Sequence, residues 1–292
     1  MPRWTIDSPR TLDLPDIAAF RVRVVSGSVA VLAGQDPPSL DVASLTGQPL
    51  LVTHEAGILT ITYEDLQPGG LLGWLHPHKH SADVTIIVPS GCPTTVSVVS
   101  ASTILSGISA KISAKSVSGD ITLDGVTGSV DAKTVSGDVE ARGLDGDLAF
   151  NSVSGDLTLV GGAVRRLAAR TVSGQVTADI DVPEGGELKV STVSGQVAAR
   201  VPALASARVD LRSASGRLRS GFDAMSSAPG AGPGAMSGTL GSGSATISLT
   251  SMTGDVTLLA RAGDPQSGAP EAEERSVKDS PTSAPTGQGD QT

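Results

Sequence analysis

Apolar and polar residues alternate in short segments through the middle of this chain. Residues 121–124 read Ile-Thr-Leu-Asp, residues 130–133 read Val-Asp-Ala-Lys, and residues 139–142 read Val-Glu-Ala-Arg. Strict alternation of this kind predicts a strand that buries one face. Because a glycine lies just before each segment, the pattern predicts many short strands separated by tight turns.

A four-residue turn recurs between these segments. It reads Val-Ser-Gly followed by Asp or Gln in five copies, and two weaker copies lie further along the chain. Its glycines are 18 to 21 residues apart, except for a last interval of 38, which predicts two repeats with one interrupted coil between them. The turn glycines are Gly119, Gly137, Gly155, Gly174, Gly195, Gly216 and Gly254.

Strands this short cannot bury enough apolar surface alone, so the repeats have to stack. If each repeat forms one coil, equivalent positions lie about 4.8 Å apart, as in any sheet. The sequence therefore predicts an all-β fold, a single-chain parallel β-helix (β-solenoid) with about 18–21 residues per coil. Helical repeats are excluded because the chain has no 3.6-residue period.

The repeated turn predicts three columns at the corner of the stack. The glycines are expected to adopt a positive φ where the chain turns. The serines are expected to form a hydroxyl ladder that bonds to neighbouring serines or to the turn backbone. The valines are expected to stack as an aliphatic column made of Val117, Val135, Val153, Val172 and Val193.

Three regions differ in regularity. Residues 1–90 are rich in strand-like segments but irregular, which predicts a cap or a set of early coils, and residues 91–261 carry the solenoid repeats. The Pro- and Gly-rich segment 223–243 is predicted to be a flexible insertion. Residues 262–292 are acidic and almost free of large apolar side chains, which predicts a disordered tail.

Composition narrows the classes of function. Aromatic residues make up 2% of the chain, which suits a thin core. A net charge of −9 argues against nucleic acid as a partner. One cysteine, Cys92, excludes an internal disulfide framework. The sequence has no secretory signal and no long apolar stretch, so we expect a cytoplasmic protein that does not insert directly into a membrane, with a cell-surface location as the alternative.

Three turn aspartates are candidates for a metal site. Asp120, Asp138 and Asp156 would stack one per coil, and a cation such as Ca²⁺ would relieve their repulsion. The alternative is an ordinary turn residue, neutralised by Lys115 and Lys133 across the corner. We expect the second role and no metal, because Gln or Arg occupies the same position in later copies.

Two further groups could carry chemistry. His76, His78 and His80, with His54 elsewhere, could hold a metal, but we expect an exposed loop because no Cys or carboxylate cluster accompanies them. A partly basic column is expected on the outside, with ion pairs between coils from Asp124 to Arg142 and from Asp179 to Arg200. The column consists of Lys115, Lys133, Asn151, Arg170, Ser191 and Arg212.

The repeated Val-Ser-Gly-Asp turns, the alternating strands between them and an early copy at residues 25–29 resemble a bacterial family of unknown function. Its members are labelled putative adhesins or β-strand-repeat proteins. The resemblance covers roughly residues 10–260 and implies a right-handed parallel β-helix. It supplies no catalytic residues, and the label implies exposure at a cell surface.

No motif for catalysis or for a cofactor is visible in the chain. It lacks a nucleophile elbow, a phosphate-binding loop and a His-Glu metal helix, so we expect no enzyme activity. The repetitive surface instead predicts a non-catalytic structural or protein-interaction scaffold. Its partner would be an unknown protein or a second copy of the chain. The alternative is an adhesin-like module that binds carbohydrate or a cell surface.

Overall fold

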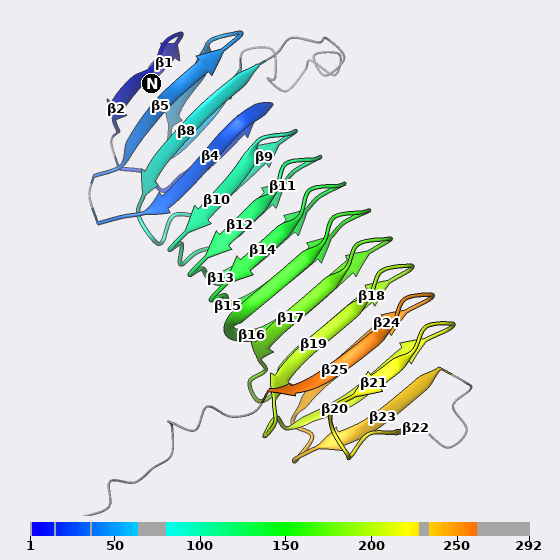
Figure 1. The fold of residues 1–292 in the computed structure, drawn as a ribbon. Coiled ribbons are helices and arrows are strands. Elements are labelled where there is room, and N and C mark those ends of the chain that lie inside the picture. The colour runs from blue at the N-terminus through cyan, green and yellow to red at the C-terminus, as the bar shows by residue number, and fades with distance from the viewer. Residues whose placement is uncertain (1, 15, 36, 64–79, 228–233, 262–292) are drawn as a thin grey trace, which may run out of the picture. The chain divides into compact units, whose positions relative to one another are not determined.

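The computed structural model describes residues 2–14, 16–35, 37–63, 80–227 and 234–261. These residues form strands and turns and contain no helix, and none of them could therefore cross a membrane as a helix. The strands pair into two sheets, here called sheet A and sheet B, and each coil contributes one strand to each sheet (Figure 1). This confirms the predicted all-β, solenoid-like fold.

Sheet A contains one half of each coil. Its inner strands pair in parallel, and antiparallel strands lie at both ends. In spatial order its strands are β1 (Arg3–Ile6), β6 (Leu50–Glu55), β7 (Ile58–Tyr63), β3 (Ala19–Val24), β9 (Thr94–Val98), β11 (Ile112–Lys115), β13 (Thr127–Lys133), β15 (Asp145–Asn151), the second half of β16 (Leu157–Thr171), β18 (Glu187–Thr192), β24 (Ala245–Ser251), β20 (Ala207–Ser213), β23 (Ala235–Leu240) and β22 (Ser226–Ser227).

Sheet B contains the other half of each coil, and strand β16 passes from sheet B into sheet A. In spatial order its strands are β2 (Arg10–Asp13), β5 (Ser39–Thr46), β8 (Ser81–Val88), β4 (Ser26–Ala33), β10 (Ser102–Ser106), β12 (Ile121–Asp124), β14 (Val139–Arg142), the first half of β16, β17 (Val176–Asp181), β19 (Val197–Pro202), β25 (Val256–Arg261) and β21 (Leu218–Ser220).

The middle coils are the regular part of the stack. Each strand pairs in parallel with the equivalent strand of the next repeat, so Val130 lies opposite Leu148 and Ile121 opposite Val139. The apolar member of each alternating pair is buried between the sheets, as predicted. Phe150 is the only aromatic residue buried among residues 112–181, so the core there is built mainly from Val, Leu, Ile and Ala.

The C-terminal coils do not follow the order of the chain. Strand β24 lies between β18 and β20, and β25 lies between β19 and β21. Figure 1 shows this inserted coil in orange between yellow-green and yellow coils. The spacing of the turn glycines does not predict this order. Within the 38 residues between the last two turn glycines, the chain first completes the coil of β20 and β21 at the end of the stack. It then returns and forms the coil of β24 and β25 between that coil and the coil of β18 and β19. We call the segment between the two coils the excursion.

The excursion also contains a strand that the sequence does not predict. Part of segment 223–243, predicted to be a flexible insertion, is strand β23, which pairs antiparallel with β20. Residues 228–233 lie outside the described residues. The edge of β20 would otherwise expose unpaired backbone groups, and β23 covers it. The Pro and Gly residues at the centre of segment 223–243 predict a turn, but they give no sign that the residues after them pair with β20.

The N-terminal 90 residues are interleaved in the same way. Strand β3 lies between β7 and β9, and β4 lies between β8 and β10, so the first coil of the chain is the second coil of the stack. Antiparallel partners β5 and β6 cover β8 and β7. The N-terminal end of the stack therefore finishes in antiparallel strands in both sheets, and the C-terminal end does so in sheet A, whereas sheet B ends there in the short parallel strand β21.

Candidate functional site

In every regular coil, five consecutive residues form the corner between sheet A and sheet B. They are a serine or threonine, the exposed valine, a serine, the turn glycine and an aspartate or glutamine. The residue before the exposed apolar side chain is a serine or threonine, and from Ser152 onward its hydroxyl oxygen accepts a hydrogen bond from the turn glycine, whereas Ser116 Oγ has no partner among the described residues. Ser152 Oγ accepts from the N–H of Gly155 at 2.7 Å, and Thr192 Oγ1 accepts from that of Gly195 at 3.0 Å. These hydroxyl residues were not among the predicted site residues, although a Ser or Thr precedes every repeated turn: Ser116, Thr134, Ser152, Thr171, Thr192, Ser213 and Ser251.

The turn glycines are required for a different reason from the predicted one. None of the seven adopts a positive φ, which instead occurs at glycines of the opposite turn such as Gly125 and Gly143. A Cβ at Gly137 would lie 2.1 Å from the carbonyl oxygen of Gly119 in the coil below. The prediction of positive φ is wrong, because the corners stack backbone on backbone. The stacked order is Gly119, Gly137, Gly155, Gly174, Gly195, Gly254 and Gly216.

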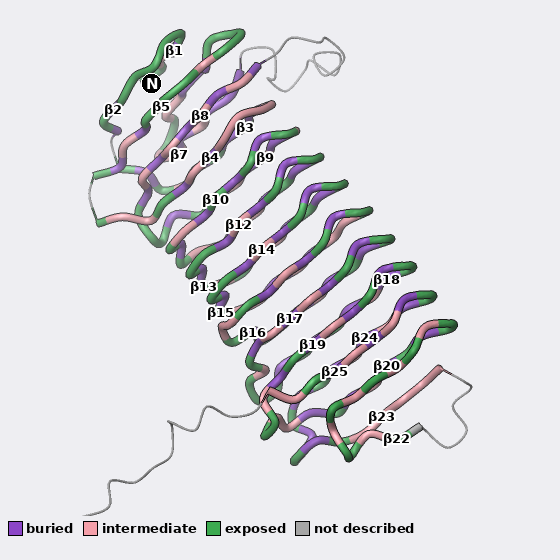
Figure 2. Tube along the Cα trace, viewed as in Figure 1, coloured by how far each residue is buried: buried purple, intermediate pink, exposed green. Residues whose placement is uncertain are grey.

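The valine column exists, but it faces solvent. Its side chains are between 36% and 55% exposed, and Met252 of the inserted coil takes its place between the last valine and Ala214. Figure 2 shows the corners as exposed tips along one edge of the stack. We call this column the corner ladder; its members are Val117, Val135, Val153, Val172, Val193 and Met252.

Polar side chains beside the ladder bond to the next coil. Ser136 Oγ donates to the carbonyl of Val117 at 3.3 Å, and the other corner serines repeat this contact. Asp120 Oδ1 accepts from the N–H of Asp138 at 3.0 Å, and Asp138 Oδ1 accepts from that of Asp156 at 2.8 Å. The aspartate stack is thus explained by backbone bonds between coils. Among the described residues no group of three or more His, Cys, Asp or Glu side chains could hold a metal.

The histidines are not brought together where the structure describes them. His76 and His78 lie outside the described residues. His80 is buried, its ring stacks on that of Tyr63 with centroids 4.9 Å apart, and its Nδ1 accepts from the N–H of Gln48. His54 instead contacts the backbone oxygen of Asp16. His80 therefore has a packing role at the N-terminal end of the stack.

The basic column is present on the outer face of sheet A. Lys115 pairs in register with Lys133, and the column continues through Asn151, Arg170 and Ser191. Thr250 of the inserted coil follows, and Arg212 comes last. Lys133 forms an ion pair with Asp131 at 3.0 Å, so the prediction that it neutralises Asp138 is wrong.

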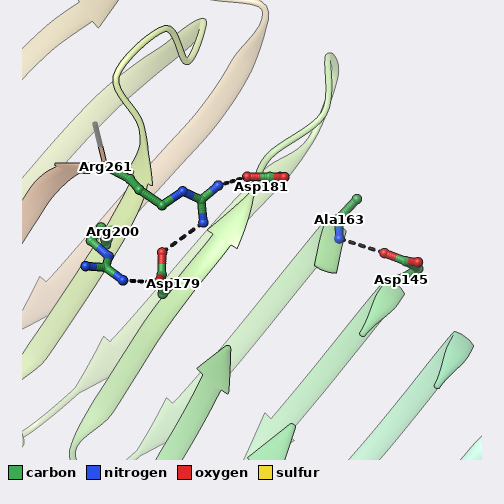
Figure 3. Close-up of polar contacts among 6 residues, drawn as sticks. All are labelled: Asp145, Ala163, Asp179, Asp181, Arg200 and Arg261. Carbon is green, nitrogen blue, oxygen red and sulfur yellow. Dashed lines mark hydrogen bonds and ion pairs between the residues drawn. The ribbon is translucent and has the colours of Figure 1, made fainter. Parts of the chain in front are cut away.

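Ion pairs tie neighbouring coils of sheet B together (Figure 3). The predicted pair of Asp179 and Arg200 is present, and Arg261 of the inserted coil also reaches Asp179, at 3.0 Å, and Asp181. The hydrogen bond from Arg200, with support from Arg261, lowers the pKa of Asp179.

Two other contacts involve charged side chains, one in sheet B and one at the start of a strand of sheet A. The predicted pair of Asp124 and Arg142 is wrong, because Arg142 pairs with Glu140 of its own strand at 2.7 Å. Near the opposite turn, Asp145 accepts from the N–H of Ala163 at 2.7 Å (Figure 3). These charged side chains therefore bind mainly one another and the backbone.

Residues 50–259 match the model of the family Toastrack DUF4097. Among solved structures, a putative adhesin from Bacteroides fragilis is 11% identical over 89% of this chain and 97% of its own, with a TM-score of 0.45. A putative adhesin from Parabacteroides distasonis is 11% identical over 87% and 96%, with a TM-score of 0.43. A putative cell adhesion protein from Clostridium sporogenes is 12% identical over 87% and 100%, with a TM-score of 0.22. No curated protein matches the chain.

Proposed function

The chain belongs to the Toastrack DUF4097 family, and we propose that it is a non-catalytic scaffold that binds protein through its corner ladder. The observation that carries this proposal is a continuous column of six exposed apolar side chains, one per coil. A contiguous apolar patch rimmed by polar residues is typical of a protein-binding surface. The corner places the column on a stiff support, because backbone stacks directly on backbone beneath it.

The polar groups beside the ladder support a binding role over a catalytic one. The serine hydroxyls donate to valine carbonyls, and the aspartates accept amide hydrogens from the next coil. A general base or a nucleophile needs a free lone pair aimed at a substrate and a partner that activates it. These hydroxyls and carboxylates instead form hydrogen bonds with backbone groups of the neighbouring coil. Such bonds hold the exposed side chains at a fixed spacing, as a binding surface requires.

A capture experiment with matched variants tests the proposal. The bait proteins are the wild-type chain, a ladder variant (Val153→Lys with Val172→Lys) and a control (Val160→Lys with Leu259→Lys). Val160 and Leu259 are similarly exposed apolar residues on the outer face of sheet B, so the control adds the same charge elsewhere. We expect proteins retained by the wild type and the control to be lost by the ladder variant. Equal retention by all three would contradict the proposal.

A saccharide-binding module is the second candidate. The outer face of sheet A carries a column of hydroxyl, amide and cationic groups, in which Lys115 and Arg170 form no ion pair with another described residue. Such groups suit an acidic polysaccharide, since cations bind carboxylates and hydroxyls bind sugar oxygens. This candidate predicts retention on an acidic polysaccharide matrix, lost in Arg170→Glu and kept in Arg142→Glu. Equal retention of both variants would contradict it.

Two further properties complete the proposal. We propose that the coils are right-handed, because crossovers between parallel strands of one sheet take that hand in about 98% of cases. An experimental structure with left-handed coils would contradict this. We also propose a cytoplasmic location. Detection in washed cell-envelope fractions, and not in the soluble lysate, would contradict that location and favour the saccharide-binding candidate.

A further inference from the structure

We infer that the corner ladder binds the corner ladder of a second copy of this chain, with the coils of both copies running in the same direction. The inference rests on the proposed function and names its partner. It is carried by two charged columns that flank the ladder, one on each side. Their charges fit a second copy in one orientation and oppose it in the other.

The two flanks differ consistently in charge. On the sheet A side, two residues before each ladder residue, the side chains are cationic or neutral. On the sheet B side, three residues after it, they are anionic or neutral. The sheet A flank consists of Lys115, Lys133, Asn151, Arg170, Ser191 and Thr250, and the sheet B flank of Asp120, Asp138, Asp156, Gln175, Gln196 and Asp255.

The difference in charge between the two flanks favours one of the two possible orientations of a symmetric dimer. If a twofold axis runs along the stacking direction, the sheet A flank of each copy faces the sheet B flank of the other. Lys115 then lies opposite Asp120 of the partner subunit. If the axis is perpendicular to the stacking direction, the coils run in opposite directions and cations face cations. Like charges placed across an interface oppose association, so the first arrangement is favoured.

The same axis fixes the register. It places each coil opposite its own equivalent, and none of the six coils then brings two like charges together. The match ends at the next coil, where Arg212 and Arg217 occupy the two flanks and Ala214 occupies the ladder position. The large apolar column and the charge complementarity therefore stop at the same place, as expected if both belong to one interface.

The groups that such an interface would cover are already bonded. The hydroxyls of Ser136 and Ser154 donate to carbonyls of their own chain, so burying these serines in an interface does not leave a donor unpaired. Each stacked aspartate accepts one backbone amide and keeps a second oxygen for a lysine of the partner. The ion pair of Lys133 with Asp131 is exposed and weak, and Lys133 is free to exchange it.

Sedimentation of the full chain over a concentration series tests the partner. We expect a dimer for the wild type and for the control Val160→Lys with Leu259→Lys, and a monomer for Val153→Lys with Val172→Lys, with unchanged circular dichroism in all three. A wild type that stays monomeric overturns the inference. If the ladder variant nevertheless loses a different captured protein, the proposed function survives with another partner. If it loses none, both fail.

Single cysteines test the orientation. With the axis along the stack, each ladder position meets itself, so Val117→Cys, Val153→Cys and Val193→Cys should each form a disulfide-linked dimer on mild oxidation. Val160→Cys is the matched control and should not, and the native Cys92 is buried. In the opposite orientation at most one position can link to itself, and with the six ladder positions in full overlap Val117→Cys would link to Met252→Cys in a mixture. That second pattern would overturn the inference.

Discussion

The middle coils and the C-terminal coils use the same corner but reach it by different chain paths. In the middle, Ser152 and Gly155 close a corner that lies on the corner 18 residues earlier. At the C-terminal end, Ser251 and Gly254 close the same corner with a hydrogen bond of 2.8 Å, yet Gly254 stacks on Gly195, 59 residues earlier in sequence. The corner is therefore a local unit that stacks on any equivalent corner.

The two chain paths differ in how much each coil depends on residues far away in sequence. A coil placed in chain order needs only a short connection, whereas the inserted coil needs its two neighbours in place around it. Contacts between residues far apart in sequence cost more chain entropy and slow folding. The inserted coil is consequently the part of the stack in which the stability of the fold depends most on distant residues.

The largest effect should come from removing the inserted coil. A chain that ends at residue 243 lacks β24 and β25, which leaves β18 and β20 about 9.6 Å apart, two strand spacings, with no partner between them. We expect loss of the cooperative thermal transition in circular dichroism, and aggregation on gel filtration. A chain that ends at residue 261 is the control. Normal unfolding of the shorter chain would show that the C-terminal coils form independently of the insertion.

Alanine at the turn glycines should have the next largest effect, and an equal one in both regions. A Cβ would lie 2.1 Å from the oxygen of Gly119 in Gly137→Ala and 1.9 Å from that of Gly195 in Gly254→Ala. We expect each to lower the free energy of unfolding by about 3 kcal/mol or more, because a backbone carbonyl has to move. Urea unfolding measures this. Gly91→Ala, where nothing lies within 4 Å, should be neutral, and tolerance at Gly137 would refute the stacked corner.

Loss of a corner hydroxyl should have a moderate effect. Ser251→Ala leaves the N–H of Gly254 and the oxygen of Gly195 without the bonds they form now, and Ser152→Ala does the same to the N–H of Gly155. We expect a loss of about 1–3 kcal/mol in the free energy of unfolding for each. A loss confined to Ser251→Ala would show that the corner is not an equivalent unit in the two regions.

The smallest effect on stability should come from the ion pairs of Asp179 and Asp147, and it should depend on pH. Hydrogen bonds from arginine lower the pKa of Asp179, which ties in the inserted coil, and of Asp147 in the middle coils. A carboxyl with a folded pKa below its unfolded value of about 3.9 adds stability above that pH and loses it as the pH falls through the folded value.

Asp179→Asn and Asp147→Asn should therefore each cost about 1 kcal/mol or less near pH 7, and the difference from wild type should shrink below about pH 4. Thermal unfolding between pH 3 and 7 measures this, with Asp124→Asn as a control, because Asp124 forms no ion pair with another described residue. A difference that persists unchanged in acid would show that the arginine pairs do not contribute through the carboxylate charge.

Local features were predictable from the chain because their causes are local. Alternation identified the strands and their buried faces, and the repeated turn identified the corners and their stacking in register. The outward basic column followed from the same spacing. In each case the relevant neighbours lie within one repeat, so the period alone places them.

Four features were decided only by the tertiary structure. The corner glycines are needed because of a carbonyl in the coil below, and the valines are exposed because the corner turns them outward. The order of the last coils and the pairing of β23 depend on which distant edge remains open. Equal corners can stack in more than one order, so the repeat determines how coils stack, and the open edges at the two ends determine which coil stacks on which.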